Sequence, residues 1–171
     1  NYNVVVGDEA GTAISTGDAN VAIGFEALKT EDTGTSSTAI GFQALKNQNN
    51  NAANYNTAVG RSAGAAVTTG TYNNLFGALA GDALTVGAAN TVMGWGALTS
   101  DTQGSSSVAI GHAALGTQNF TSATAAYNTA VGSNAGGAVS TGFQNTLIGA
   151  LAGDAITTGT QNILIGYVAT A

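Results

Sequence analysis

Apolar and polar positions repeat along the whole chain with a period close to 17 residues. Each repeat, which we call a rung, is marked by one glycine, and positions in a rung are numbered from that glycine. The ten marker glycines, which define rungs 1 to 10, are Gly7, Gly24, Gly41, Gly60, Gly77, Gly94, Gly111, Gly132, Gly149 and Gly166. An alanine stands at position +3 of every rung. A fixed short period of this kind predicts a solenoid, in which each rung stacks only on its neighbours.

The three residues before each marker glycine predict a short strand. Position −1 is Val, Ile, Phe or Met throughout, position −2 is apolar and most often Ala, and position −3 is mostly Thr or Val. A β-branched run that ends in glycine is typical of a strand followed by a turn. Because neighbouring residues of a strand point to opposite faces, apolar residues at both −1 and −2 indicate two apolar faces. One face would line the inside of the coil, and the other needs a separate partner.

Rungs fall into two kinds, which differ at positions +4 and +7. In Gly-type rungs, +4 is Gly and +7 is apolar, as in Gly81 with Leu84. In Leu-type rungs, +4 is Leu and +7 is polar, as in Leu98 with Asp101. Each complete rung therefore supplies one further large apolar side chain for a packed core. Every 17-residue rung also has Gly at +10, which predicts a second corner that needs positive φ or close backbone approach.

A longer order groups the rungs into blocks of four. The string YNTAVG occurs at Tyr55–Gly60 and again at Tyr127–Gly132. We therefore interpret residues 1–171 as a single repeat domain with blocks 1–54, 55–126 and 127–171. The fourth rung of a block carries extra residues at 46–54 and 116–126, which are rich in Asn, Thr and Ala and are predicted to be surface loops.

Composition narrows the classes of function. Charged residues make up only 7 % of the chain, the net charge is −6, and there is no cysteine. Three scattered cations, Lys29, Lys46 and Arg61, make nucleic acid an unsuitable partner. No stretch approaches the ~20 apolar residues of a membrane span, so we expect no membrane insertion. A single thin coil buries little apolar surface, which favours a homotrimer around a closed axis, with end-to-end assembly into a filament as an extension.

The repeat resembles a known family of fibre proteins. The units NVAIGFEALKTEDTGTSSTAIGFQAL (Asn20–Leu45) and NTLIGALAGDAITTGTQNILIG (Asn145–Gly166) are similar to the NTAIG-type repeats of phage tail-fibre and surface-fibre proteins. They also resemble the head repeats of YadA-like trimeric autotransporter adhesins, although the period of 17 is longer than theirs. The resemblance implies a left-handed parallel β-roll that trimerises side by side. It also implies an extracellular location, in a virion tail fibre or a cell-surface appendage.

An asparagine column at position −4 is interpreted as a structural ladder rather than a binding stripe. Its members are Asn3, Asn20, Asn56, Asn73, Asn90, Asn128, Asn145 and Asn162. The only histidine, His112, has no partner histidine for a catalytic set, and its position varies between rungs. Asp82 and Asp154 are too isolated to ring a calcium ion. We therefore expect no enzyme activity, no cofactor and no metal.

Position +1 is the candidate for recognition. Phe25, Phe42, Trp95, His112 and Tyr167 all stand there. Aromatic side chains on an uncharged surface suit the binding of a carbohydrate on a cell-surface glycan or receptor. The other interpretation is that these rings cover the junction between chains.

The sequence as a whole predicts an all-β parallel β-roll of about ten rungs that serves as a structural fibre module. Such a module gives stiffness and reach, with attachment to a receptor or surface as a second role. One alternative is a trimeric bacterial adhesin head that binds host or matrix surfaces. A lesser alternative is an ice- or carbohydrate-binding solenoid. Adjacent threonines such as Thr68 and Thr69 raise the ice-binding interpretation. Because adjacent residues of a strand point to opposite faces, they would give only a single column of threonines, whereas ice binding requires a flat double array.

Overall fold

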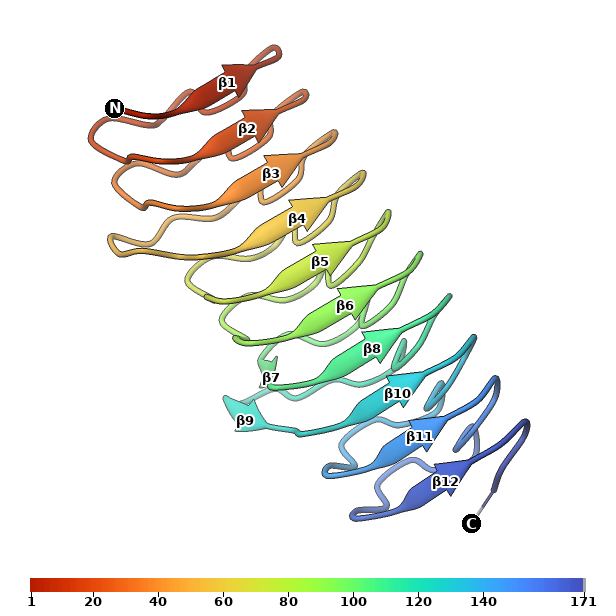
Figure 1. Cartoon of the computed structure of the whole chain (residues 1–171). Helices are drawn as coiled ribbons and strands as arrows, with labels where there is room; N and C mark the ends of the chain where they lie inside the picture. Colours follow the sequence, from red (N-terminus) through yellow and green to blue (C-terminus); the bar gives the residue numbers. More distant parts are fainter. Residues whose placement is uncertain (171) are drawn as a thin grey trace.

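The computed structural model describes residues 1–170 and shows ten rungs stacked into one elongated body (Figure 1). Ten strands form one sheet in the order β1-β2-β3-β4-β5-β6-β8-β10-β11-β12, and all of its neighbouring pairs are parallel. These strands are β1 (Val4–Val6), β2 (Val21–Ile23), β3 (Thr38–Ile40), β4 (Thr57–Val59), β5 (Asn74–Phe76), β6 (Thr91–Met93), β8 (Val108–Ile110), β10 (Thr129–Val131), β11 (Thr146–Ile148) and β12 (Ile163–Ile165). The described residues contain no helix, so none could cross a membrane. The prediction of an all-β parallel solenoid of ten rungs is confirmed.

The strands pair in register, so that residues at the same position of successive rungs lie side by side. Ala22 pairs with Ala39, for example, and Ile23 pairs with Ile40. Side chains at −2 point into the coil, and those of rungs 2 to 9 are fully buried. Side chains at −3 and −1 stand on the outer face of the same sheet, and most are half-buried or exposed. The two apolar faces expected from the sequence are therefore one inner face and one outer face.

The core is a narrow stack of small and medium side chains inside the coil. The alanines at +3 of rungs 1 to 9 are buried beside the −2 residues. The third contribution comes from Leu at +4 in Leu-type rungs, as Leu28 and Leu98, or from +7 in Gly-type rungs, as Val67 and Leu84. The predicted exchange between these two places is thus seen in the core.

The two glycine columns have different roles. The marker Gly94 has a φ of 142°, and a Cβ there would lie 2.3 Å from the carbonyl oxygen of Gly111. Gly87, at +10, lacks a positive φ, but a Cβ there would lie 2.3 Å from the Gly104 carbonyl oxygen. Only close approach therefore requires glycine at that corner. Positive φ occurs instead at many non-glycine residues, among them Glu26 and Leu28.

The two extra segments are not simple surface loops. Residues Gly104–Ser105 (β7) and Thr124–Ala125 (β9) form a second, two-stranded parallel sheet, and Thr35 makes an isolated bridge with Ala53 in the first block. Several residues of these segments are buried, namely Gln48, Asn54, Gln118, Phe120 and Ala126. The expectation of surface loops is wrong for these residues, because their side chains close the inside of the coil where the regular rung is interrupted.

Candidate functional site

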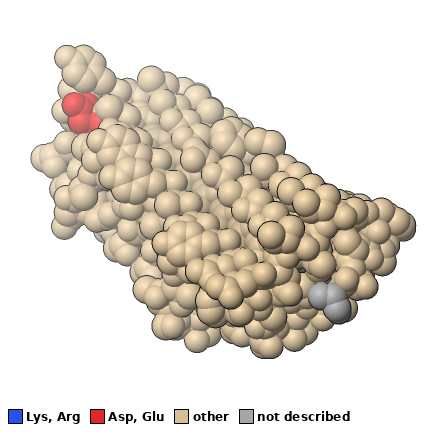
Figure 2. Space-filling view, turned by 60° about the horizontal axis from the view of Figure 1, so that its bottom comes forward, with Lys and Arg blue, Asp and Glu red and all other residues tan. Residues whose placement is uncertain are grey.

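The outer face of the large sheet, which we call the sheet face, consists of positions −3 and −1. None of its twenty residues is charged. In the middle of the stack Met93 is 49 % exposed and Phe76 is 38 % exposed, and Ile148 is also exposed. The view of Figure 2 shows one acidic patch and neither Lys nor Arg. The −1 column of this face is a contiguous apolar strip, which is typical of an interaction surface.

Threonines form half of the −3 column of the sheet face, and the sequence analysis noted Thr at −3 without interpreting it as an exposed column. They are Thr38, Thr57, Thr91, Thr129 and Thr146. They lie beside the −1 column, so that the face presents two columns in parallel. The expectation of a single threonine column referred to positions +8 and +9, where Thr68 donates its hydroxyl to the Thr85 carbonyl within the body of the coil.

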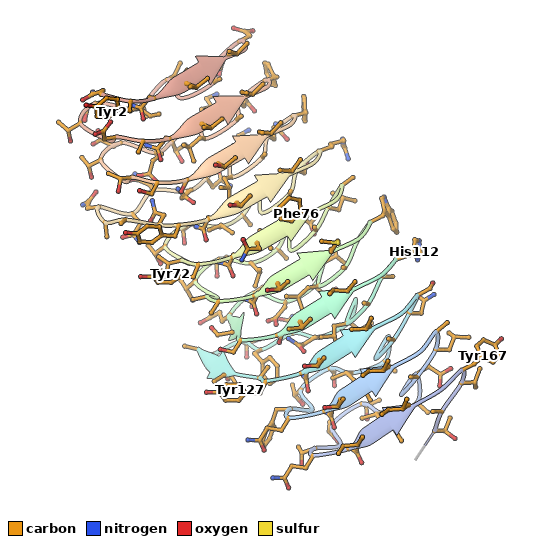
Figure 3. All side chains as sticks on the ribbon, in the orientation of Figure 1. Tyr2, Tyr72, Phe76, His112, Tyr127 and Tyr167 are labelled. Carbon is orange, nitrogen blue, oxygen red and sulfur yellow. The ribbon has the colours of Figure 1, made fainter. Side chains whose placement is uncertain are left out.

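The aromatic residues at +1 lie along one edge of the stack, which we call the aromatic edge. Phe25 and Phe42 stack with ring centroids 5.3 Å apart, and Trp95 and His112 stack at 5.0 Å. The Cζ atom of Arg61 lies 6.0 Å from the centroid of the Phe42 ring. In Figure 3, His112 and Tyr167 lie along this edge, apart from Phe76 on the sheet face.

A second aromatic edge runs along the opposite side and was missed in the sequence analysis. Tyr55 and Tyr72 stack at 5.4 Å, and both stand at position −5. Tyr2 and Tyr127 share that position, and Figure 3 shows Tyr2, Tyr72 and Tyr127 on this side of the stack. The signal was present in the sequence, because the same position carries Tyr in four rungs.

The asparagine side chains at −4 hold each rung to the next and close it across its own coil. Asn73 shows the pattern: its Oδ1 accepts a hydrogen bond from the backbone N–H of Asn90 at 3.0 Å. Its Nδ2 donates to the carbonyl of Gly87, in the same rung, at 2.9 Å. Most of these side chains are fully buried, a position that suits structural bonds and leaves no stripe open to a ligand.

Two buried polar clusters lie inside the Leu-type rungs, where the core is otherwise apolar. In the first, Glu31 accepts from the side chains of Gln48 at 2.8 Å and Asn54 at 3.0 Å, and from the backbone N–H of Gly34 at 2.8 Å. In the second, Asp101 accepts from the Gln118 side chain at 2.5 Å and from the backbone N–H groups of Gly104 and Phe120 at 2.9 and 3.1 Å. Both carboxylates are fully buried.

The extra segments explain these carboxylates. In the regular rung 8, the N–H of Gly142 donates to the carbonyl of Thr157 in the next rung at 3.3 Å. Next to an extra segment, the N–H groups of Gly34 and Gly104 donate to Glu31 and Asp101 instead. The carboxylates therefore satisfy backbone groups that the inserted residues leave without the usual acceptor. This is a structural role, and it involves no open site.

Two of the three cations are paired in one charged cluster. Glu26 accepts from Lys29 and Lys46, each with an N–O distance of 2.7 Å, and from the Gln43 amide at 2.7 Å. Lys29 also pairs with Glu9. The ammonium groups of Lys29 and Lys46 lower the pKa of Glu26 to about 2, and the carboxylates raise the pKa of Lys29. These cations are therefore not scattered, as the sequence suggested, but join rungs 1 to 3.

Within residues 1–170 no group of three His, Cys, Asp or Glu side chains could hold a metal ion, and no pocket is found. The sheet face and the two aromatic edges therefore lie on the outside of the molecule and are not enclosed in a pocket. Comparison with protein-family models, curated proteins and solved structures finds no match for this chain.

Proposed function

We propose that this chain is a structural fibre module, three copies of which pack side by side through the sheet face to form an extracellular shaft. The observation that carries the proposal is the uncharged sheet face, on which Phe76, Met93 and Ile148 remain exposed. Burial of a large exposed apolar side chain contributes ~1.5–3 kcal/mol, so the exposed −1 residues give a strong drive to associate; they are Val6, Phe76, Met93, Ile148 and Ile165.

A second and a third copy of the same chain suit this face better than an unrelated partner. Its columns repeat at the ~4.8 Å strand spacing over ten rungs, a length of about 48 Å. Another copy carries the same repeat and meets the face without a change of register. Three copies around an axis close the assembly, and the resemblance of the repeats to trimeric fibre proteins supports this number. Stiffness and reach follow from the parallel ladder that runs the length of the sheet.

The mass of the particle in solution tests this proposal, for example by light scattering combined with size exclusion. We expect three 16.6-kDa chains per particle. The double variant Val59→Asp/Ile110→Asp places charges on the sheet face and should give monomers that keep their β circular-dichroism spectrum. Ser133→Asp adds a charge at an exposed +1 position outside this face and should keep the trimer. A monomeric wild type, or a trimer that resists the double variant, would overturn the proposal.

One observation favours a second candidate, an ice-binding solenoid. The −3 threonines and the −1 residues together make the double array that such a function requires, and they lie on a ten-stranded sheet. Against it, the −1 column changes size from Val59 to Phe76 to Met93, which interrupts any match to a lattice. Thermal hysteresis measured on the wild type and on Thr91→Leu decides between them. The fibre proposal expects no hysteresis from either protein.

Attachment to a surface, as in an adhesin head, is the remaining alternative. An adhesin head would form the same trimer as the proposed fibre module but would in addition bind a ligand. The aromatic edge is the place where the structure offers a ligand something to bind, and that edge can be tested separately from the trimer.

A further inference from the structure

The aromatic edge is a column of planar groups that is interrupted by a single rung at Ala78, and again by two rungs at Ser133 and Ala150. Backbone hydrogen bonds fix its register: the +1 carbonyls of Arg61, Ala78 and Trp95 accept from the next rung's +2 N–H at 2.9, 3.0 and 2.9 Å. Phe25, Phe42 and Arg61 form three successive layers, and Trp95 and His112 form two more. Between them stands Ala78, whose side chain has no ring. We call the space over Ala78, between Arg61 and Trp95, the Ala78 gap.

The gap has the thickness of one ring. Arg61 and Trp95 are two rungs apart, which corresponds to about 9.6 Å at the parallel strand spacing. A ring placed midway would lie about 5 Å from each, a stacking distance that aromatic pairs favour. The stacked pairs on the same edge have centroid separations of 5.3 and 5.0 Å. The edge is therefore already spaced to accept one more ring over Ala78.

The space beside Trp95 is also open. Position +2 of rung 6 is Gly96, whereas the other nine rungs carry a side chain there. A Cβ added to Gly96 would meet no atom within 4 Å. Trp95 itself is 55 % exposed. One face of the Trp95 indole stacks on His112, and the opposite face borders the Ala78 gap.

Charge identifies the ligand that suits this gap. Arg61 is exposed and, among the described residues, has no carboxylate within 4.0 Å, whereas Lys29 and Lys46 are both paired. Positions +1 and +2 of rungs 4 to 6 carry no Asp or Glu. A guanidinium forms bidentate hydrogen bonds with a carboxylate and stacks on flat surfaces. An indole offers an apolar face to the C–H groups of a sugar ring.

We propose that the Ala78 gap binds one ring of a carboxylated sugar, such as a uronic acid. The C–H face of the ring stacks on Trp95, its carboxylate bonds to Arg61, and the methyl group of Ala78 forms the floor. This inference does not depend on the proposed trimer, because the aromatic edge follows the marker glycines and lies outside the sheet face. In Figure 3, His112 on this edge is well separated from Phe76 on the sheet.

Fluorescence of the single tryptophan tests the proposal on the full chain. Titration with oligogalacturonate should change the Trp95 emission in a saturable way. Neutral oligogalactose should bind at least about tenfold more weakly, because it lacks the charge-assisted hydrogen bond. Arg61→Gln should weaken the binding of oligogalacturonate by a similar factor and leave the affinity for the neutral sugar unchanged.

Two matched variants separate the gap from the rest of the edge. Ala78→Phe fills the gap and should abolish binding, while Ala150→Phe makes the same change at +1 of rung 9 and should leave binding unchanged. Circular dichroism checks that each variant is folded. The Val59→Asp/Ile110→Asp variant should bind as the wild type does, so that loss of the trimer and loss of binding are distinguished. No saturable response to oligogalacturonate, or unchanged binding by Ala78→Phe, would overturn the proposal.

Discussion

Rungs 5 and 6 show what the two kinds of rung share and where they differ. At +4, Gly81 has a φ of 56° and Leu98 has a φ of 52°, so the backbone is the same whichever residue is present. At +7, Leu84 fills the core of rung 5, whereas rung 6 buries Leu98 together with the carboxylate of Asp101. The backbone conformation at +4 is therefore the same in two rungs whose interiors differ in chemistry.

The special groups of the molecule are concentrated on the Leu-type rungs. These rungs carry the buried carboxylates of Glu26, Glu31 and Asp101, both ring pairs of the aromatic edge, both extra segments and most of the charged cluster. The Gly-type rungs carry an apolar +7 residue and small residues at +1 apart from Arg61 and Asp8. The Gly-type rungs thus have the more uniform interior, and the Leu-type rungs carry the buried charges and the insertions.

The largest expected effect comes from removing the buried carboxylate of rung 6. Asp101→Leu leaves the N–H groups of Gly104 and Phe120 and the amide of Gln118 without their acceptor. Each unsatisfied buried group costs about 1–3 kcal/mol, so we expect a loss of about 3–9 kcal/mol. Urea unfolding measures this loss.

The control for this variant removes a carboxylate from a Gly-type rung. Asp82 lies at +5 of rung 5, is only half-buried, and accepts from the Thr99 hydroxyl at 2.6 Å. Asp82→Leu should cost only about 0.5–1.5 kcal/mol, the value of one hydrogen bond. Equal losses in the two variants would show that the Leu-type interior has no special dependence on its carboxylate.

The next effect concerns what both kinds of rung share. Gly94→Ala places a Cβ against the carbonyl oxygen of Gly111, at a residue with a φ of 142°. Gly77→Ala places a Cβ 2.6 Å from the carbonyl oxygen of Gly94. We expect each to cost about 2–5 kcal/mol from backbone strain and overpacking. Gly96→Ala, in open space at a φ of 59°, should cost about 1 kcal/mol. Thermal unfolding compares the three, and a harmless Gly94→Ala would contradict the close approach of the rungs.

The period, the strands and the asparagine column could be predicted from the sequence, because each depends on residues that recur at one position. The buried carboxylates could not, because the need for Asp101 arises only where the four extra residues of rung 7 remove a carbonyl from its place. The Ala78 gap has the same character. The gap exists only because planar side chains stand at the same position in the rungs before and after Ala78. The hydrogen bonds between rungs set that alignment, and the sequence alone does not show it.

The smallest expected effect compares the two Leu-type pairs with each other. Rungs 2 and 3 carry Glu26, Lys29 and Lys46, whereas the corresponding positions of rungs 6 and 7 are uncharged. The pKa of Glu26 is lowered from 4.5 to about 2, first by Lys29 and then by Lys46 and Gln43. A lowered folded-state pKa stabilises the protein above the ordinary value, and this stabilisation is lost as the pH falls from about 4.5 toward 2.

Glu26→Gln should therefore lower the unfolding temperature at pH 6, and the difference from the wild type should shrink through this window and vanish near pH 2. Because Lys46 acts through Glu26, the double variant Glu26→Gln/Lys46→Gln should lose little more than Glu26→Gln alone. Circular dichroism melts between pH 2 and 6 measure both. A difference that stays constant over this range would show that the cluster joins rungs 1 to 3 by packing alone, in which case the two Leu-type pairs would not differ in their response to acid.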